Sequence, residues 1–105
     1  MAWRCTGRNN EEMVDKFVHV GIISSKEVED AFRFIPRGAF VPSEIQDEAY
    51  IDAPIRGDPH VHMSAPHMYA TILEALDLQP GLFLYLFAII HNCFKIVWLY
   101  IVSCV

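Results

Sequence analysis

The sequence predicts a mainly α-helical fold, and two observations carry that prediction. Three segments within residues 1–81 repeat apolar side chains at intervals of three and four, and each is bounded by capping residues, glycine or proline. The composition then changes abruptly, because all 13 acidic residues and seven of the eight basic residues lie before Leu82. We therefore divide the chain into a helical region, residues 1–81, and an apolar tail, residues 82–105.

The first predicted helix covers residues 10–20. Asn9 or Asn10 is a candidate N-cap, and two glutamates follow where a helix N-terminus favours negative charge. Gly21 supplies the C-terminal stop. The predicted buried stripe comprises Met13, Val14, Phe17, Val18 and Val20.

The second predicted helix covers residues 25–35. It starts at Ser24 or Ser25, and Ser24 forms a capping-box pattern with Glu27. Pro36 ends it. Its predicted buried stripe comprises Val28, Ala31, Phe32 and Ile35.

Residues 36–66 are rich in proline and glycine, which predicts a long ordered loop or a series of turns of functional importance. A third helix is predicted over residues 66–78, because Pro66 suits the first helical position and follows Ser64 and Ala65. Pro80-Gly81 is the expected stop. The predicted buried face comprises Met68, Ile72, Ala75 and Leu76.

The tail, residues 82–105, contains 20 apolar residues in 24. As a helix it would extend roughly 36 Å, enough to cross a bilayer core of about 30 Å, so membrane association is one hypothesis. His91, Asn92 and Lys95 oppose clean insertion. The many β-branched and aromatic residues also suit β-structure, although a helix is the favoured prediction.

The overall composition limits the classes of function. A chain of 105 residues accommodates one small domain, and its net charge of −5 argues against a nucleic-acid partner. The three cysteines are widely spaced and include no Cys-x-x-Cys pair, and residues 1–10 lack the apolar run of a signal peptide. These features predict a reducing, cytoplasmic location, with membrane association through the tail as the alternative.

Four short motifs follow one another in the helical region in an order and spacing that resemble a known family. They are Phe34-Ile35-Pro36-Arg37, Phe40-Val41-Pro42, Ala49-Tyr50-Ile51-Asp52-Ala53-Pro54 and Ser64-Ala65-Pro66-His67-Met68. The series is similar to the N-terminal part of the protein-L-isoaspartate O-methyltransferases and covers residues 2–82. Ala2-Trp3-Arg4 and Ser64-Ala65-Pro66 resemble the eukaryotic members more closely than the bacterial ones, which carry Ser-Gln-Pro at the latter position.

The resemblance implies the helical N-terminal part of a Rossmann-like α/β methyltransferase that uses S-adenosylmethionine. Its substrates are proteins and peptides with L-isoaspartyl, and in some members D-aspartyl, residues. The damaged carboxylate attacks the methyl group in line, and the resulting ester collapses to a succinimide. Such a reaction depends mainly on positioning the nucleophile.

The resemblance also implies a site on residues 62–67. Ser64 corresponds to the active-site serine, whose hydroxyl can hydrogen-bond the substrate carboxylate. The expected lip of the substrate groove consists of His62, Met63, Ala65, Pro66 and His67. Read without the resemblance, Ser64 only caps the third helix, and both roles are compatible.

The sequence departs from the family pattern after Gly81. The family continues with a β-strand and a glycine-rich loop that binds the cofactor, whereas residues 82–105 contain no glycine and no acidic residue. We therefore expect a chain truncated before the sheet, with no cofactor bound. The apolar stripes of its helices would lack the sheet that they suit and would leave apolar surface exposed.

Three other residue patterns have weaker functional interpretations. His60, His62 and His67 could suggest a metal site, but no cysteine or carboxylate completes a pattern, so no metal is expected. The loop acids Asp47, Glu48 and Asp52 are interpreted as solvated, and the thiol of Cys5 as inert.

Three hypotheses for the whole chain follow from these observations. The chain is a catalytically inactive form of the methyltransferase, a protein anchored to a membrane through its tail, or a soluble module. The module would bind isoaspartyl peptides or a full-length partner without turnover.

Overall fold

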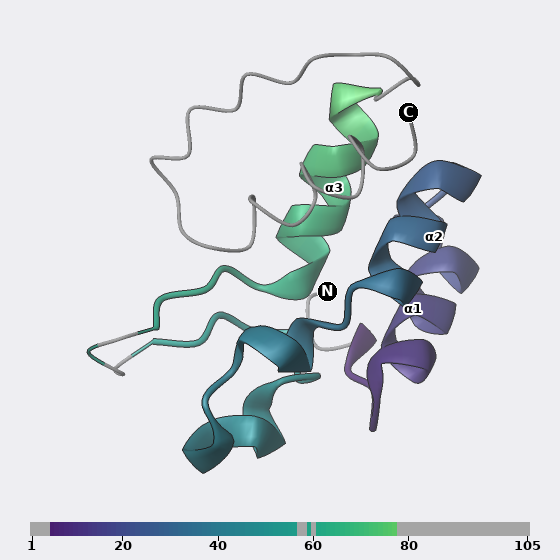
Figure 1. Cartoon of the computed structure of the whole chain (residues 1–105). Coiled ribbons are helices and arrows are strands. Elements are labelled where there is room, and N and C mark those ends of the chain that lie inside the picture. The colour runs from purple at the N-terminus through teal and green to yellow at the C-terminus, as the bar shows by residue number, and fades with distance from the viewer. Residues whose placement is uncertain (1–4, 57–58, 60, 78–105) are drawn as a thin grey trace.

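The fold is that of a computed structural model, which describes residues 5–56, 59 and 61–77 (Figure 1). Within these ranges the only β-structure is a single antiparallel bridge between Ile55 and Met63, so the mainly helical prediction is confirmed. The predicted tail helix lies outside the described residues. In chain order the elements are α1 (Asn10–His19), α2 (Lys26–Phe34), the 3-10 helices η2 (Arg37–Phe40) and η3 (Ser43–Glu48), and α3 (Pro66–Leu76).

Helix α1 confirms the first prediction almost in full. The side chain of Asn9 accepts a hydrogen bond from the backbone N–H of Glu12 at 2.9 Å and is therefore the N-cap. Gly21 adopts a φ of +84°, a left-handed conformation that suits glycine after a helix. The predicted stripe is wrong at its C-terminal end, because Val18 and Val20 are exposed.

Helix α2 begins with a cap that differs in detail from the predicted one. Ser25 is the N-cap, and its hydroxyl accepts from the backbone N–H of Val28. The capping-box prediction for Ser24 is wrong, since its hydroxyl donates instead to Glu74 of α3. The helix ends at Phe34, two residues before Pro36, as a proline requires.

Helix α3 starts at Pro66 as predicted but ends earlier than expected. Asp77 adopts a left-handed conformation with φ 47° and closes the helix before Pro80-Gly81 is reached, so the predicted stop is wrong. The residue that precedes Pro66, Ala65, is the N-cap and makes no side-chain capping hydrogen bond.

The predicted buried face of α3 is also wrong. Met68, Ile72 and Leu76, here called the outer stripe, are 45%, 39% and 40% exposed, and Ala75 is exposed too. The helix instead buries Ala70 and Leu73. Apolar residues surround most of this helix, so periodicity alone could not identify the side that faces the interior.

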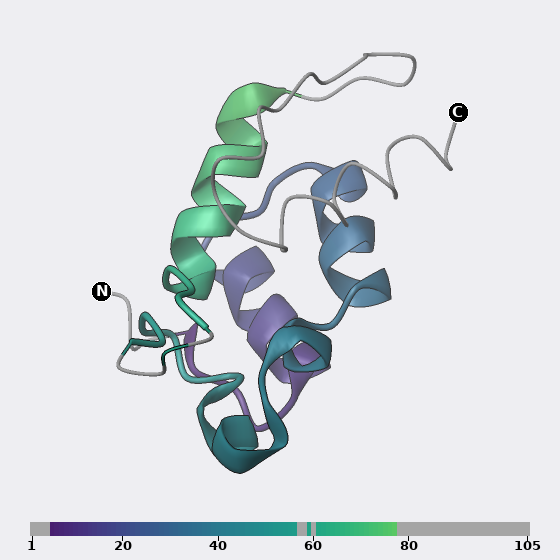
Figure 2. The ribbon, with the colours of Figure 1, turned by 60° about the vertical axis from the view of Figure 1, so that its left-hand side comes forward.

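The main core lies where the three α-helices meet. Helices α1 and α2 lie side by side, and α3 flanks them (Figures 1 and 2). Phe17 of α1 and Phe32 of α2 meet edge to face, with ring centroids 6.0 Å apart. The buried members of the cluster are Cys5, Met13, Phe17, Ile23, Val28, Ala70 and Leu73.

A second, smaller core forms inside the segment that connects α2 to α3. It consists of Val41, Ala49, Ile55 and Met63. Tyr50 packs against both cores and thereby joins the segment to the helices. The described part of residues 36–66 is therefore an ordered series of turns, as the sequence predicts, rather than an open loop.

Candidate functional site

The candidate site lies on residues 61–67, between the β-bridge and α3. Met63 is held by two backbone hydrogen bonds with Ile55, of 2.9 and 3.1 Å, and both side chains are buried. Immediately after this bridge Ser64 turns out to the surface. Its side chain is exposed, and its hydroxyl makes no hydrogen bond with any residue that the structure describes.

The structure separates the predicted site residues into two sets. His62 and Ser64 are exposed, and the side chain of His67 is 26% exposed, so these three are accessible to a ligand. Met63, Ala65 and Pro66 are buried, where they fix the backbone beneath Ser64. Contact of any of the six residues with a substrate stays a prediction.

The interpretation of Ser64 as a helix cap is wrong. Ala65 occupies the N-cap position of α3, with φ −59° and ψ 143°, in the polyproline-II region that is open to a residue before a proline. The polar group of Ser64 that does interact is its backbone N–H, which donates to the hydroxyl oxygen of Tyr69 at 3.1 Å. The Ser64 hydroxyl is therefore not used to stabilise the helix.

The most important residue that the sequence interpretation missed is Asp52. A solvated loop carboxylate is the prediction, and Asp47 and Glu48 are indeed exposed, but Asp52 is only 1% exposed. Its Oδ1 atom accepts from the backbone N–H of His67 at 3.1 Å and lies 2.8 Å from Nδ1 of the same residue. Its Oδ2 atom is buried and has no hydrogen-bond partner among the described residues.

Asp52 compensates for the missing cap of α3. The first backbone N–H groups of a helix have no partner within the helix and carry partial positive charge. The carboxylate of Asp52 reaches one of these groups from a turn 15 residues earlier in the chain. In the sequence, Asp52 is an acidic residue close to a proline in a predicted turn. Such a residue cannot be distinguished from a solvated acid without knowledge of how the turn packs.

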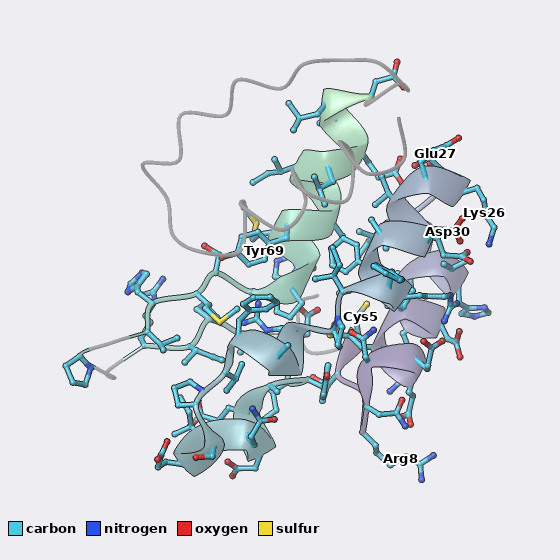
Figure 3. All side chains as sticks on the ribbon, viewed as in Figure 1. Cys5, Arg8, Lys26, Glu27, Asp30 and Tyr69 are labelled. Atoms are coloured by element: carbon cyan, nitrogen blue, oxygen red, sulfur yellow. The ribbon has the colours of Figure 1, made fainter. Side chains whose placement is uncertain are left out.

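A second contact supports the segment from the other side. The side chain of Tyr69 projects from α3 in Figure 3. The guanidinium carbon of Arg37 in η2 lies over its ring, 5.9 Å from the ring centroid. Arg37 itself is buried, at 8% exposure. The side chain of Tyr69, whose hydroxyl oxygen accepts from the Ser64 N–H, is thus fixed between α3 and the connecting segment.

Cys5, labelled in Figure 3, belongs to the main core together with buried residues of all three α-helices. Burial, and then the negative charge of Asp52, raise the pKa of its thiol, against a smaller lowering by Lys16. A buried thiol with a raised pKa is a poor nucleophile, which supports its interpretation as inert.

The described residues contain neither a metal-binding cluster nor a membrane-spanning helix. No group of three or more histidine, cysteine or acidic side chains in the described ranges is arranged to hold a metal ion. His60 lies outside those ranges, so the cluster with His62 and His67 is not tested. None of the helices that the structure describes is long and apolar enough to traverse a bilayer.

Comparisons with known proteins identify the family. Residues 8–84 match the family model described as Protein-L-isoaspartate(D-aspartate) O-methyltransferase. Two curated relatives named protein-L-isoaspartate O-methyltransferase are those of Methanopyrus kandleri, 39% identical over 74 residues, and Methanothermobacter thermautotrophicus, 41% identical over 70 residues. These matches cover 70% and 67% of this chain but only 33% and 32% of the relatives. The resemblance to eukaryotic members in particular stays a prediction.

A solved structure agrees with this match. It is a protein-L-isoaspartate O-methyltransferase from Plasmodium falciparum in complex with S-adenosyl-L-homocysteine. The TM-score is 0.56 at 28% sequence identity, over 67% of this chain and 30% of that protein. The chain therefore spans about a third of the length of its relatives, and it belongs to the protein-L-isoaspartate(D-aspartate) O-methyltransferase family.

Proposed function

We propose that residues 8–77 form the substrate-recognition part of a methyltransferase that uses S-adenosylmethionine and acts on isoaspartyl residues. Family membership supports the reaction class. The observation that carries the assignment of the site is Ser64, an exposed hydroxyl without a partner among the described residues, on a backbone fixed on both sides. A preorganised donor of this kind suits an anionic group of the substrate.

Ser64 orients the substrate carboxylate. Its hydroxyl donates a hydrogen bond to one carboxylate oxygen and leaves the other oxygen available as the nucleophile. S-adenosylmethionine, when bound, supplies an activated methyl group. The role of this chain's residues is then to bind and orient the carboxylate, because no proton has to be removed from a carboxylate before it attacks.

We further propose that the chain of 105 residues does not bind the cofactor by itself. The matched region ends at residue 84, and residues 82–105 contain neither glycine nor an acidic side chain. A dinucleotide-type site needs glycines for close approach of the backbone and an acidic residue for the ribose. The residues present do not fit the group, so no catalytic step is assigned to this chain alone.

The recognition proposal is tested in a chimera. Residues 8–77 of this chain replace the matching region of the Methanopyrus kandleri relative, and transfer of labelled methyl groups to an isoaspartyl peptide is measured. We expect the chimera to methylate the isoaspartyl peptide faster than the matched aspartyl peptide. Ser64→Ala should lower kcat/KM by roughly 10- to 100-fold, as expected for one hydrogen bond to a charged group.

Ser43→Ala is the matched control, because Ser43 is an exposed serine of η3 far from the site in sequence. It should leave kcat/KM of the chimera unchanged. An equal effect of Ser43→Ala and Ser64→Ala, or the same rate with both peptides, would contradict the proposal.

The proposal that the chain alone is inactive has its own test. Calorimetry with S-adenosylmethionine should show no binding, and the methyl-transfer assay should show no turnover. Turnover that disappears on Ser64→Ala would instead mean that residues 78–105 complete a cofactor site. Binding of isoaspartyl peptide without turnover would favour the non-catalytic peptide-binding module.

A further inference from the structure

We propose that Asp52 and Tyr69 are the positioning residues that hold Ser64 in its exposed orientation, one on each side of the bend that leads into α3. The inference deepens the proposed function and rests on it for the purpose of that orientation. It assigns no contact with substrate to either residue. Both act through the backbone of residues 64–67.

Asp52 fixes the end of the bend at His67. One oxygen of its carboxylate meets both the backbone N–H and the ring of His67, at 3.1 and 2.8 Å. Asp52 is itself anchored, because its backbone N–H donates to the hydroxyl of Thr6 at 2.9 Å. Burial of a carboxylate is costly unless hydrogen bonds compensate, and the two contacts with His67 provide that compensation at Oδ1.

Tyr69 fixes the beginning of the bend at Ser64. The backbone N–H of Ser64 lies before the helix and has no helical acceptor, and the Tyr69 hydroxyl provides one at 3.1 Å. The ring cannot easily swing away, since Arg37 lies against its face.

The two contacts enclose a stiff, buried pair of residues. Ala65 and Pro66 lie between the fixed amides of Ser64 and His67, and proline restricts both its own backbone and that of the residue before it. Because the backbone is held at both ends, little freedom remains in the direction of the Cα–Cβ bond of Ser64. Ordering that is present before binding does not have to be acquired on binding.

The experiment uses the ¹⁵N-labelled chain of 105 residues and measures two quantities by NMR. The first is the rate of amide hydrogen exchange at Ser64 and His67. The second is the shift of the Ser64 resonance with millimolar isoaspartyl peptide, compared with the matched aspartyl peptide. The variants are Asp52→Ala, Asp52→Asn and Tyr69→Phe.

Tyr69→Phe should speed exchange at Ser64 by roughly 2- to 10-fold, as expected for the loss of one hydrogen bond. Asp52→Ala should speed amide exchange at both His67 and Ser64. Asp52→Asn keeps an oxygen acceptor and should retain most of the protection of the unmodified chain. The controls are Asp47→Ala, an exposed acid of η3, and Tyr50→Phe, whose hydroxyl accepts from Gly38 instead. Both controls should leave Ser64 unchanged.

The outcomes separate the two proposals. Unchanged exchange at Ser64 in Asp52→Ala and Tyr69→Phe overturns the positioning roles, whatever the peptides do. Faster exchange along all of α3, including Ala70 and Leu73, also overturns them, because it indicates general destabilisation. Local exchange effects in the variants, with no discrimination between peptides by the unmodified chain, support the positioning roles and contradict the proposed recognition by Ser64.

Discussion

The α1–α2 pair and α3 differ in how their ends and faces are satisfied. Helices α1 and α2 are capped by neighbouring side chains, those of Asn9 and Ser25. Helix α3 has no such cap and depends on the distant Asp52. The difference teaches that α1 and α2 are specified largely by local sequence, whereas α3 is specified by the segment that presents Ser64.

The faces of the helices differ in the same sense. The side of α1 that faces the core buries Met13, Val14 and Phe17 completely. Helix α3 buries Ala70 and Leu73, while its outer stripe stays about two-fifths exposed. A helix with two apolar faces and one covered face is typical of an element that contacts more than one neighbour.

The largest expected effect tests the tightly packed side of this comparison. Phe17→Ala removes a fully buried ring from the main core and should lower the free energy of unfolding by about 3–5 kcal/mol, measured by urea denaturation. Phe34→Ala is the matched control, because Phe34 is 75% exposed, and it should change the value by less than about 1 kcal/mol. Similar losses in both variants would mean that Phe17 is not part of a tightly packed core where the three α-helices meet.

How much the sequence could predict follows the same division. The start of α1 could be predicted from Asn9 and the first residue of α3 from Pro66, but the Asp52 contact that compensates for the missing cap of α3 could not be predicted. The capping of α2 could be read only in part, because Ser24 turns to Glu74, 50 residues away. Ser64 was identified by its resemblance to a family motif, not by any property of the residue itself.

The features that the sequence could not predict depend on long-range contacts. Burial of Asp52 results from the packing of its turn against Thr6 and His67, which no local pattern encodes. The choice between the two apolar faces of α3 is made by the position of α1 and α2. Asp77 ends α3 in a left-handed conformation, although Pro80-Gly81 is the more obvious stop signal in the sequence.

The next effect concerns the link between the two regions. Glu74 of α3 accepts from the backbone N–H groups of Ser24 and Ser25, both at 2.9 Å, and from their hydroxyls. Glu74→Ala removes all of these bonds and should lower the free energy of unfolding by about 1.5–3 kcal/mol near neutral pH. Exposed Glu27 provides the control, and Glu27→Ala should have a much smaller effect.

This link should also depend on pH. Burial opposes ionisation of Glu74, but the hydrogen bonds from Ser25 and Ser24 outweigh it and lower the pKa of the carboxyl group. Because the pKa of Glu74 is lower in the folded state than in the unfolded state, its ionised carboxylate stabilises the fold at pH values above the unfolded-state pKa of about 4.3. This contribution is lost as the pH falls through the folded-state pKa. The difference in stability between the unmodified chain and Glu74→Gln should therefore shrink on acidification from about pH 7 to about pH 3. A difference that grows on acidification would contradict the lowered pKa.

A smaller effect tests whether α1 is stabilised by its local cap. Asn9→Ala removes the acceptor for the backbone N–H of Glu12 and should lower the free energy of unfolding by about 1 kcal/mol. Asn9→Asp and Asn9→Ser keep an acceptor and should recover most of the loss. If all three variants were equally destabilised, packing of the Asn9 side chain rather than its hydrogen bond would be responsible.

The smallest effect is expected on the outer stripe of α3. Leu76 is 40% exposed in the last turn, where lysine has similar helix propensity and its positive charge interacts favourably with the helix end. Leu76→Lys should therefore change the free energy of unfolding by no more than about 0.5 kcal/mol and should reduce binding of a hydrophobic dye. Leu73→Lys, one turn earlier on the buried face, should be strongly destabilising because it places a charge in the core. Equal destabilisation by the two lysines would show that another part of the full chain covers the outer stripe, and the contrast between α3 and the α1–α2 pair would then be lost.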